Sequence, residues 1–179
     1  MKKIIILILS VLSIIYVFIN NQRVENIIPQ DAIRFRVIAN SNTIYDQNIK
    51  LQVKNVVQNK ILELLADSSS IEDTRTILKN NIQEIDEIVR ETLKKLDYDK
   101  DYKIKYGLNY FPKKEYKGIE YKEGKYESLV ISLGNANGDN WWCVLFPPLC
   151  LVESEENTKA DPEYSFFLKE FIEKYTNKK

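Results

Sequence analysis

The spacing of hydrophobic residues changes once along this 179-residue chain, and that change most constrains its fold. Between residues 45 and 96, apolar side chains recur about every 3.6 residues, the period of an amphipathic helix. From Tyr102 the period becomes two, which is typical of half-buried strands. Helices followed by a run of strands predict an α+β fold. The helical stripes consist of Ile49, Val53, Val56, Val57, Leu64 and Leu65, and then Ile77, Leu78, Ile82, Ile85, Val89, Leu93 and Leu96.

Turn and capping residues divide the chain into elements. Asn80-Asn81 is a point at which the second helix can be interrupted. Pro112 ends the strand that begins at Tyr102. The predicted fold is a mostly antiparallel sheet of about four to five strands, with a helical hairpin and a C-terminal helix packed on it, plus an N-terminal membrane helix. The predicted order is strand 32–39, helices 45–66 and 70–96, strands 102–110, 119–122, 126–133 and 141–146, with 119–122 and 126–133 as a hairpin, and a helix that begins at Asp161-Pro162.

The first residues form an export segment. Lys2 and Lys3 precede a largely apolar run at residues 4–19, which as a helix would be about 24 Å long. This run is short for a bilayer core of about 30 Å, but no A-x-A-like cleavage site follows it, which favours an uncleaved anchor over a cleaved signal peptide. Either form places the rest of the chain outside the cytoplasm. We therefore predict a signal or anchor helix at 1–22 and a linker at 23–31.

Composition excludes several classes of function. The chain has no histidine, so Ser-His-Asp and Cys-His catalysis and histidine-ligated metal sites are excluded within it. Its 26 basic and 26 acidic residues balance, so the chain lacks the excess of positive charge that is typical of proteins that bind nucleic acid. We expect no cofactor, no metal and no catalytic residues. Two alternatives to a protein-contact function stay open. One is an extracytoplasmic domain that binds or hydrolyses envelope carbohydrate through tyrosines and paired carboxylates, and the other is a purely structural anchored domain.

The most unusual segment is residues 140–150, NWWCVLFPPLC, which holds both tryptophans and both cysteines. In an extended strand, Trp142, Val144 and Phe146 face one way, and the residues between them face the other. Because both faces are apolar, one interpretation is a central strand buried on both sides. The other is a contact surface that includes the Pro147-Pro148 corner, since tryptophan and rigid proline suit protein interfaces.

The two cysteines bracket the proline corner. Outside the cytoplasm, Cys143 and Cys150 are expected to form a disulfide, which for so small a ring would add about 2.5 kcal/mol of stability. The distance between their Cα atoms decides whether this bond is allowed, and the sequence does not report that distance.

Three strings of residues resemble the stage II sporulation protein R family. The first is Gly134-x-Ala136-x-Gly138-x-Asn140 followed by WWCVLFPPLC. The second is residues 33–41, IRFRVIANS, with Asp46-Gln47 shortly after, and the third is Tyr110-Phe111-Pro112 before Gly124-x-Tyr126-Glu127. The resemblance covers residues 32–152. Asn42 and Ala136 depart from it, standing where the family pattern favours Asp and Gly. Residues 153–179, an acidic linker and the C-terminal helix, match only loosely.

The resemblance implies an exported sporulation signal of endospore formers. Such a protein acts in the space between the forespore and mother-cell membranes. There it activates, by contact, the membrane-embedded aspartic protease that matures pro-sigma-E, and it is not itself an enzyme. The expected partners are this sigma-E processing peptidase and the membrane, through the N-terminal helix. We expect the partner-binding residues to be Asn140, Trp141, Trp142, Phe146, Pro147 and Pro148, with Arg34 and Arg36 from the outer face of the first strand.

Overall fold

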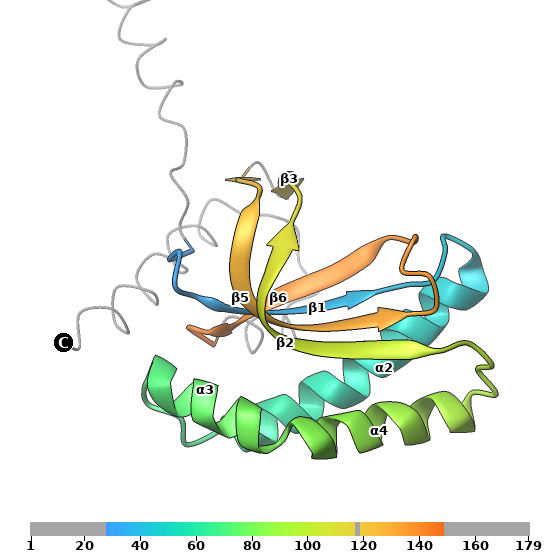
Figure 1. Cartoon of the computed structure of the whole chain (residues 1–179), viewed down its shortest axis with the longest axis horizontal. Helices are drawn as coiled ribbons and strands as arrows, with labels where there is room; N and C mark the ends of the chain where they lie inside the picture. Colours follow the sequence, from blue (N-terminus) through green and yellow to red (C-terminus); the bar gives the residue numbers. More distant parts are fainter. Residues whose placement is uncertain (1–27, 117–118, 149–179) are drawn as a thin grey trace, which may run out of the picture.

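Three helices cover one face of a four-stranded sheet in the computed structural model, which describes residues 28–116 and 119–148 (Figure 1). The predicted α+β class is confirmed. The predicted export helix at 1–22 and the C-terminal helix lie outside the described residues, and no described helix is long and apolar enough to span a bilayer. The elements are β1 (Ile33–Ile38), α2 (Ile44–Leu64), α3 (Ile71–Asn80), α4 (Ile82–Lys95), β2 (Tyr102–Phe111), β3 (Lys114–Tyr116), β4 (Ile119–Tyr121), β5 (Gly124–Leu133) and β6 (Asn140–Phe146).

The predicted second helix is divided at Asn81. This residue leaves the helical conformation, with φ −106° and ψ 12°, and its Nδ2 donates to the carbonyl oxygen of Ile77 at 2.8 Å. An asparagine side chain that bonds the backbone in this way competes with the helix, which explains the break between α3 and α4. The N-terminal ends of α2 and α3 are capped by Thr43 and Ser70. The side chain of each accepts the backbone N–H of the third residue of its helix, as is usual for threonine and serine at this position.

The core lies between the helices and the helix-facing side of the sheet. Most of the predicted stripe residues are buried there, but Val56 is 40% exposed and Ile61 takes its place in the core. The fully buried side chains from the sheet are Ile33, Phe35, Val37, Leu129, Ile131 and Leu133, and those from the helices include Val53, Ile61, Leu78, Ile85 and Val89. These residues alternate along β1 and β5, so the opposite, outer face of the sheet is composed of different side chains.

The sheet is mixed, with strand order β2-β5-β1-β6. Two of its three pairings are antiparallel, as predicted, but the central pair β1–β5 is parallel, which the sequence did not indicate. Parallel strands need a long crossover, and here the helices and β2–β4 lie between β1 and β5 in the chain. Periodicity identifies a strand but not its partner, so the parallel pairing was missed.

The predicted hairpin between 119–122 and 126–133 is wrong. Instead β2 pairs with β5 from Tyr102↔Leu133 to Phe111↔Gly124, and β3 pairs with β4 from Lys114↔Tyr121 in the same register. The four strands are therefore one long hairpin, interrupted at Pro112, where the missing backbone N–H breaks the ladder. We call residues 111–124, the distal end of this hairpin, the hairpin arm.

The long hairpin turns away from the rest of the sheet within β2 and β5, so that its distal end stands on the side opposite the helices (Figure 1). Gly107, in the middle of β2, has φ +138°, a conformation that side chains disfavour. Next to it, Asn109 Nδ2 donates to the carbonyl oxygen and to the Oγ of buried Ser128 on β5, at 3.1 Å each. These contacts hold the turn that carries the hairpin arm over the outer face.

Replacing Gly107 with alanine is expected to lower the free energy of unfolding by about 1–3 kcal/mol, because a Cβ at this φ is strained although no atom lies within 4 Å of it. Urea denaturation measures the change. Gly124→Ala is the matched control, since Gly124 has an ordinary φ and its Cβ would only touch the Tyr126 ring at 3.4 Å. Equal losses in the two variants would contradict the assignment of strain to Gly107.

A buried carboxylate joins two loops at one end of the sheet. Asp46, 4% exposed in the first turn of α2, accepts hydrogen bonds from Asn40 Nδ2 at 2.8 Å and from Ser41 Oγ, and lies 3.7 Å from Lys100 Nζ. Asn40 in turn holds the β5–β6 loop, because its Oδ1 accepts the backbone N–H of Asn135 at 3.0 Å. The hydrogen bond from Ser41 is the main cause that lowers the pKa of Asp46.

Asp46→Asn is expected to lower the free energy of unfolding at pH 7 by about 2–3 kcal/mol, because the half-buried donors Asn40 and Ser41 lose their buried, charged acceptor. The pKa of Asp46 is lowered in the fold, so its stabilisation is present above the unfolded-state value near 3.9 and is lost as the pH falls through the lower folded-state value. The difference in the free energy of unfolding between wild type and variant should therefore disappear at acidic pH. Thermal denaturation across pH 2–7 checks this, with exposed Asp67→Asn as the control; a pH-independent gap would contradict it.

Candidate functional site

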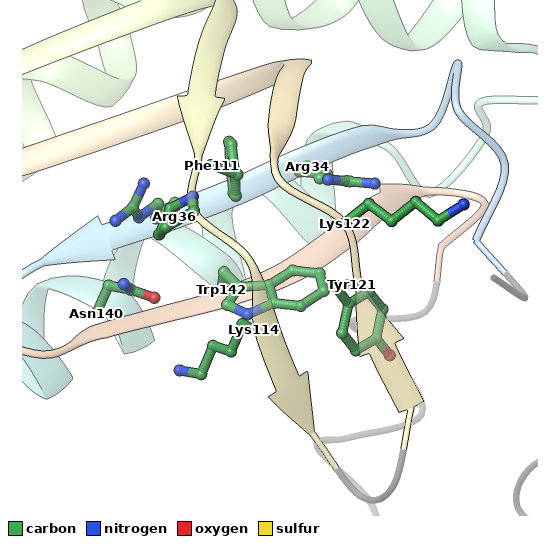
Figure 2. Close-up of a pocket in the computed structure, with 9 residues that line it drawn as sticks. Arg34, Arg36, Phe111, Lys114, Tyr121, Lys122, Asn140 and Trp142 are labelled. Carbon is green, nitrogen blue, oxygen red and sulfur yellow. The ribbon is translucent and has the colours of Figure 1, made fainter.

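The outer face of the sheet carries a hollow between β1, β6 and the hairpin arm. We call this the outer-face site, and its empty space, together with the open solvent at its mouth, amounts to about 310 Å³. Figure 2 shows Trp142 in the middle of it, with Tyr121 on one side and Arg36 and Asn140 towards the other. Its lining residues are Arg34, Arg36, Phe111, Pro112, Lys114, Tyr121, Lys122, Asn140 and Trp142.

Strand alternation explains how these residues meet. Arg34 and Arg36 lie on the outer face of β1 because Ile33, Phe35 and Val37 point into the core, as the sequence predicted. In the antiparallel β1–β6 pair, Arg36 lies opposite Trp142. The tryptophan and the arginine are therefore neighbours on one face of the sheet. Asn140 also comes from β6, and the hairpin arm supplies the other lining residues.

Arg34 is held in an aromatic cluster. Its guanidinium carbon lies 3.3 Å from the ring centroid of Tyr126, and 5.6 Å and 5.9 Å from those of Phe111 and Trp142. The residue is only 4% exposed, and burial lowers the pKa of its guanidinium. These rings provide cation–π attraction, but they supply no negative charge to balance the arginine.

Arg36 is half-buried and also has no carboxylate partner among the described residues. Its Nη1 donates to the carbonyl oxygen of Tyr110 at 3.2 Å, and its guanidinium lies 5.1 Å from the Phe111 ring. Burial lowers its pKa. The Nε atoms of both Arg34 and Arg36 are buried and have no hydrogen-bond acceptor among the described residues. The site thus contains two partly desolvated positive charges with unused donors.

Aromatic rings form the apolar wall. The Tyr121 ring meets Trp142 edge-on at a centroid distance of 4.9 Å, and Phe111 meets Trp142 at 6.5 Å in a similar T-shaped contact. Trp142 is half-buried as a result. It belongs neither to the core nor to a fully open surface.

The structure separates the predicted site residues. Trp142, Asn140, Arg34 and Arg36 line the outer-face site, as listed above, but Trp141 lies on the opposite face. There its ring meets Phe35 edge-on at 5.6 Å and lies 4.9 Å from Lys54 Nζ. Pro147 is buried and Pro148 is half-buried.

Phe146 differs from the expected alternation. A register shift between Ile33 and Arg34 places Phe146 opposite core-facing Ile33, and it packs against the core instead of sharing a face with Trp142. A bulge of this kind reverses the side on which the following residues point. The interpretation of residues 140–146 as a central strand is also wrong, because β6 is at the edge of the described sheet. Both of its faces are apolar because the helices cover one and the hairpin arm the other.

Cys143 is buried on the helix-facing side and is disulfide-bonded. Cys150 lies outside the described residues, so the Cys143–Cys150 pairing stays a prediction. In the described part of the chain, no three acidic or cysteine side chains gather as ligands for a metal ion. That the protein is not an enzyme also stays a prediction.

The lining residues that come from the hairpin arm were not predicted from the sequence. Phe111, Lys114, Tyr121 and Lys122 line the site, and Tyr126 stacks on Arg34. The available signal was Pro112 between two alternating runs, which marks an interrupted hairpin. Nothing in the spacing indicated that the arm lies over β6.

Comparison with known proteins now decides the family. A family model described as stage II sporulation protein R matches residues 29–156. The chain belongs to this family. A stage II sporulation protein R from Bacillus subtilis (strain 168) is 38% identical over 135 residues, which cover 74% of this chain. The match spans 60% of the length of that relative. No solved structure matches the chain significantly.

Two of the strings that resemble the stage II sporulation protein R family lie side by side in the fold. β1 pairs with β6, and the loop after β1 packs on the loop before β6. A Cβ at Gly134 would collide with the Asn40 side chain, and one at Gly138 with the Ser41 backbone, so the close approach of the loops requires both glycines. Between them Ala136 has φ +55°, a left-handed conformation better suited to glycine.

Ala136→Gly is therefore expected to raise the free energy of unfolding by up to about 1 kcal/mol, because the strain at positive φ outweighs the added freedom of the unfolded chain. A urea titration checks the sign. Ala66→Gly, at an exposed position outside the left-handed region, serves as the control and should be neutral or destabilising. A loss of stability in Ala136→Gly as large as that in the control would refute the argument.

Proposed function

We propose that this protein is an exported sporulation signal that activates, by direct contact, the membrane-embedded aspartic protease that matures pro-sigma-E. Membership of the stage II sporulation protein R family is the observation that carries the proposal. The apolar run at residues 4–19 supports delivery across a membrane, as an anchor or as a cleaved signal. The disulfide at Cys143 supports a location outside the cytoplasm. We assign that location to the space between the forespore and mother-cell membranes because of the family.

The physical mechanism we propose is differential binding. A domain that binds the active arrangement of the protease more tightly than the idle one shifts the population towards the active form. A shift from 1% to 99% active needs about 5.5 kcal/mol of preference. A small number of aromatic and arginine contacts can supply this amount, because such residues dominate the energetics of protein interfaces.

The outer-face site is the surface we assign to this contact. It combines half-buried Trp142 with Arg36 and Asn140 at one hollow, and tryptophan and arginine are enriched among residues that dominate binding. Trp141 and Phe146 pack towards the core, so their role in docking would be to support β6 from behind.

The test is reconstitution of the protease, pro-sigma-E and this protein in a host that does not sporulate. Trp142→Ala is expected to lower processing at least tenfold, because loss of a central anchor costs about 2 kcal/mol or more. Processing is measured by immunoblot of mature sigma-E. Leu51→Ala is the matched control, since Leu51 is an apolar residue 43% exposed on α2. This variant should support normal processing of pro-sigma-E by the protease.

Two outcomes separate the parts of the proposal. Normal processing by a folded, exported Trp142→Ala protein would remove the outer-face site from the docking role. No processing with the unaltered chain, although all components are present, would overturn the proposed function itself. Sedimentation of the chain with peptidoglycan would favour the carbohydrate-binding alternative instead.

A further inference from the structure

We propose that the outer-face site binds a carboxylate from an acidic side chain of a partner polypeptide, together with an apolar side chain next to it. This inference rests on the proposed function, because it describes the chemistry of the surface through which contact is made.

The charge of the site is one-sided. Of the nine lining residues that the structure describes, four are cationic and none is acidic, while Asn140 adds a neutral amide. The neighbouring carboxylate of Glu123 is engaged elsewhere, since it accepts the hydroxyl of Tyr110 at 2.9 Å. Across the described residues, the ion pairs lie outside this hollow. An anionic group is the ligand that complements such a lining.

The arginines have donors with no acceptor. The Nε atoms of Arg34 and Arg36 are buried and unpaired, although each guanidinium touches aromatic rings. Burying a charge without a counter-charge is costly, so the free site carries an electrostatic penalty that a bound anion would remove. A planar carboxylate can accept two parallel hydrogen bonds from the forked N–H donors of an arginine, whereas a lysine ammonium acts only as a point charge.

The shape favours a protruding side chain over a flat membrane. Arg34 lies below the surface with only 4% exposure, and the hairpin arm stands over β6 on one side of the hollow. A bilayer surface reaches cations that project from a protein, whereas a recessed cation needs a ligand that projects into it. A glutamate or aspartate on a partner loop has this form.

The aromatic wall selects what lies beside the carboxylate. Trp142 and Tyr121 meet edge-on and leave Trp142 half-buried at the hollow. An apolar side chain next to the acidic one would cover the exposed part of this ring and exclude water from the ion pair, which strengthens it. Lys114 and Lys122 are exposed at the rim and add long-range attraction.

The test is a titration of the full-length chain, ¹⁵N-labelled in nonionic detergent micelles, with two blocked peptides, Ac-Leu-Glu-Leu-NH₂ and Ac-Leu-Gln-Leu-NH₂. The indole N–H signal of Trp142, assigned with Trp142→Phe, reports binding. We expect the Glu peptide to bind at least tenfold more tightly than the Gln peptide. Arg36→Gln should weaken the Glu peptide about tenfold and remove the discrimination. Lys103→Gln, which removes an exposed cation elsewhere on β2, should change neither affinity.

Equal affinities of the two peptides, or unchanged affinity in folded Arg36→Gln, would overturn the proposal. Tighter binding of inorganic phosphate than of acetate would also overturn it, in favour of a phosphorylated ligand. Arg36 is used because Arg34 is so buried that its replacement risks unfolding, and circular dichroism verifies the fold of each variant. The titration contains no protease, so its failure is distinguishable from failure of the proposed function in the processing assay.

Discussion

The structure depends on β1, which pairs on both edges and has a different chemistry on each face. Its helix-facing side chains are fully buried in the core, while Arg34 and Arg36 point to the outer face. Parallel pairing with β5 and antiparallel pairing with β6 bring distant parts of the chain together at this strand. The core and the outer-face site are therefore two sides of one element, and a change that displaces β1 alters both.

The long hairpin covers the outer face of β6. This strand has apolar residues on both faces, and the helices cover only one of them. The turn near Gly107 brings Phe111 and Tyr121 against Trp142 on the other side. The cover is incomplete, because the hollow beside it is lined by cations that have no carboxylate partner among the described residues. This partial cover distinguishes the outer face from an ordinary second core.

Local patterns in the sequence predicted most elements, and long-range pairings were what they could not predict. The alternation in β1 placed both arginines on the outer face, and the 3.6-residue spacing of apolar side chains located the helices, because these features depend on neighbouring residues. The parallel β1–β5 pair, the bulge that turns Phe146 inward and the position of the hairpin arm depend on residues far apart in the chain. For the same reason, half of the site was predicted from residues 34–36 and 140–142, and the half from the arm was not.

The common register of β2–β5 and β3–β4 has a consequence for how this family can diversify. Removing one residue from a single strand of the arm would exchange inward and outward side chains beyond that point, so Tyr121 or Lys114 would turn away from the hollow. Matched deletions of two residues would instead preserve the alternation and only shorten the reach of the arm. Length variation in this segment should therefore be tolerated in even steps and selected against in odd ones, whatever residues occupy the tip.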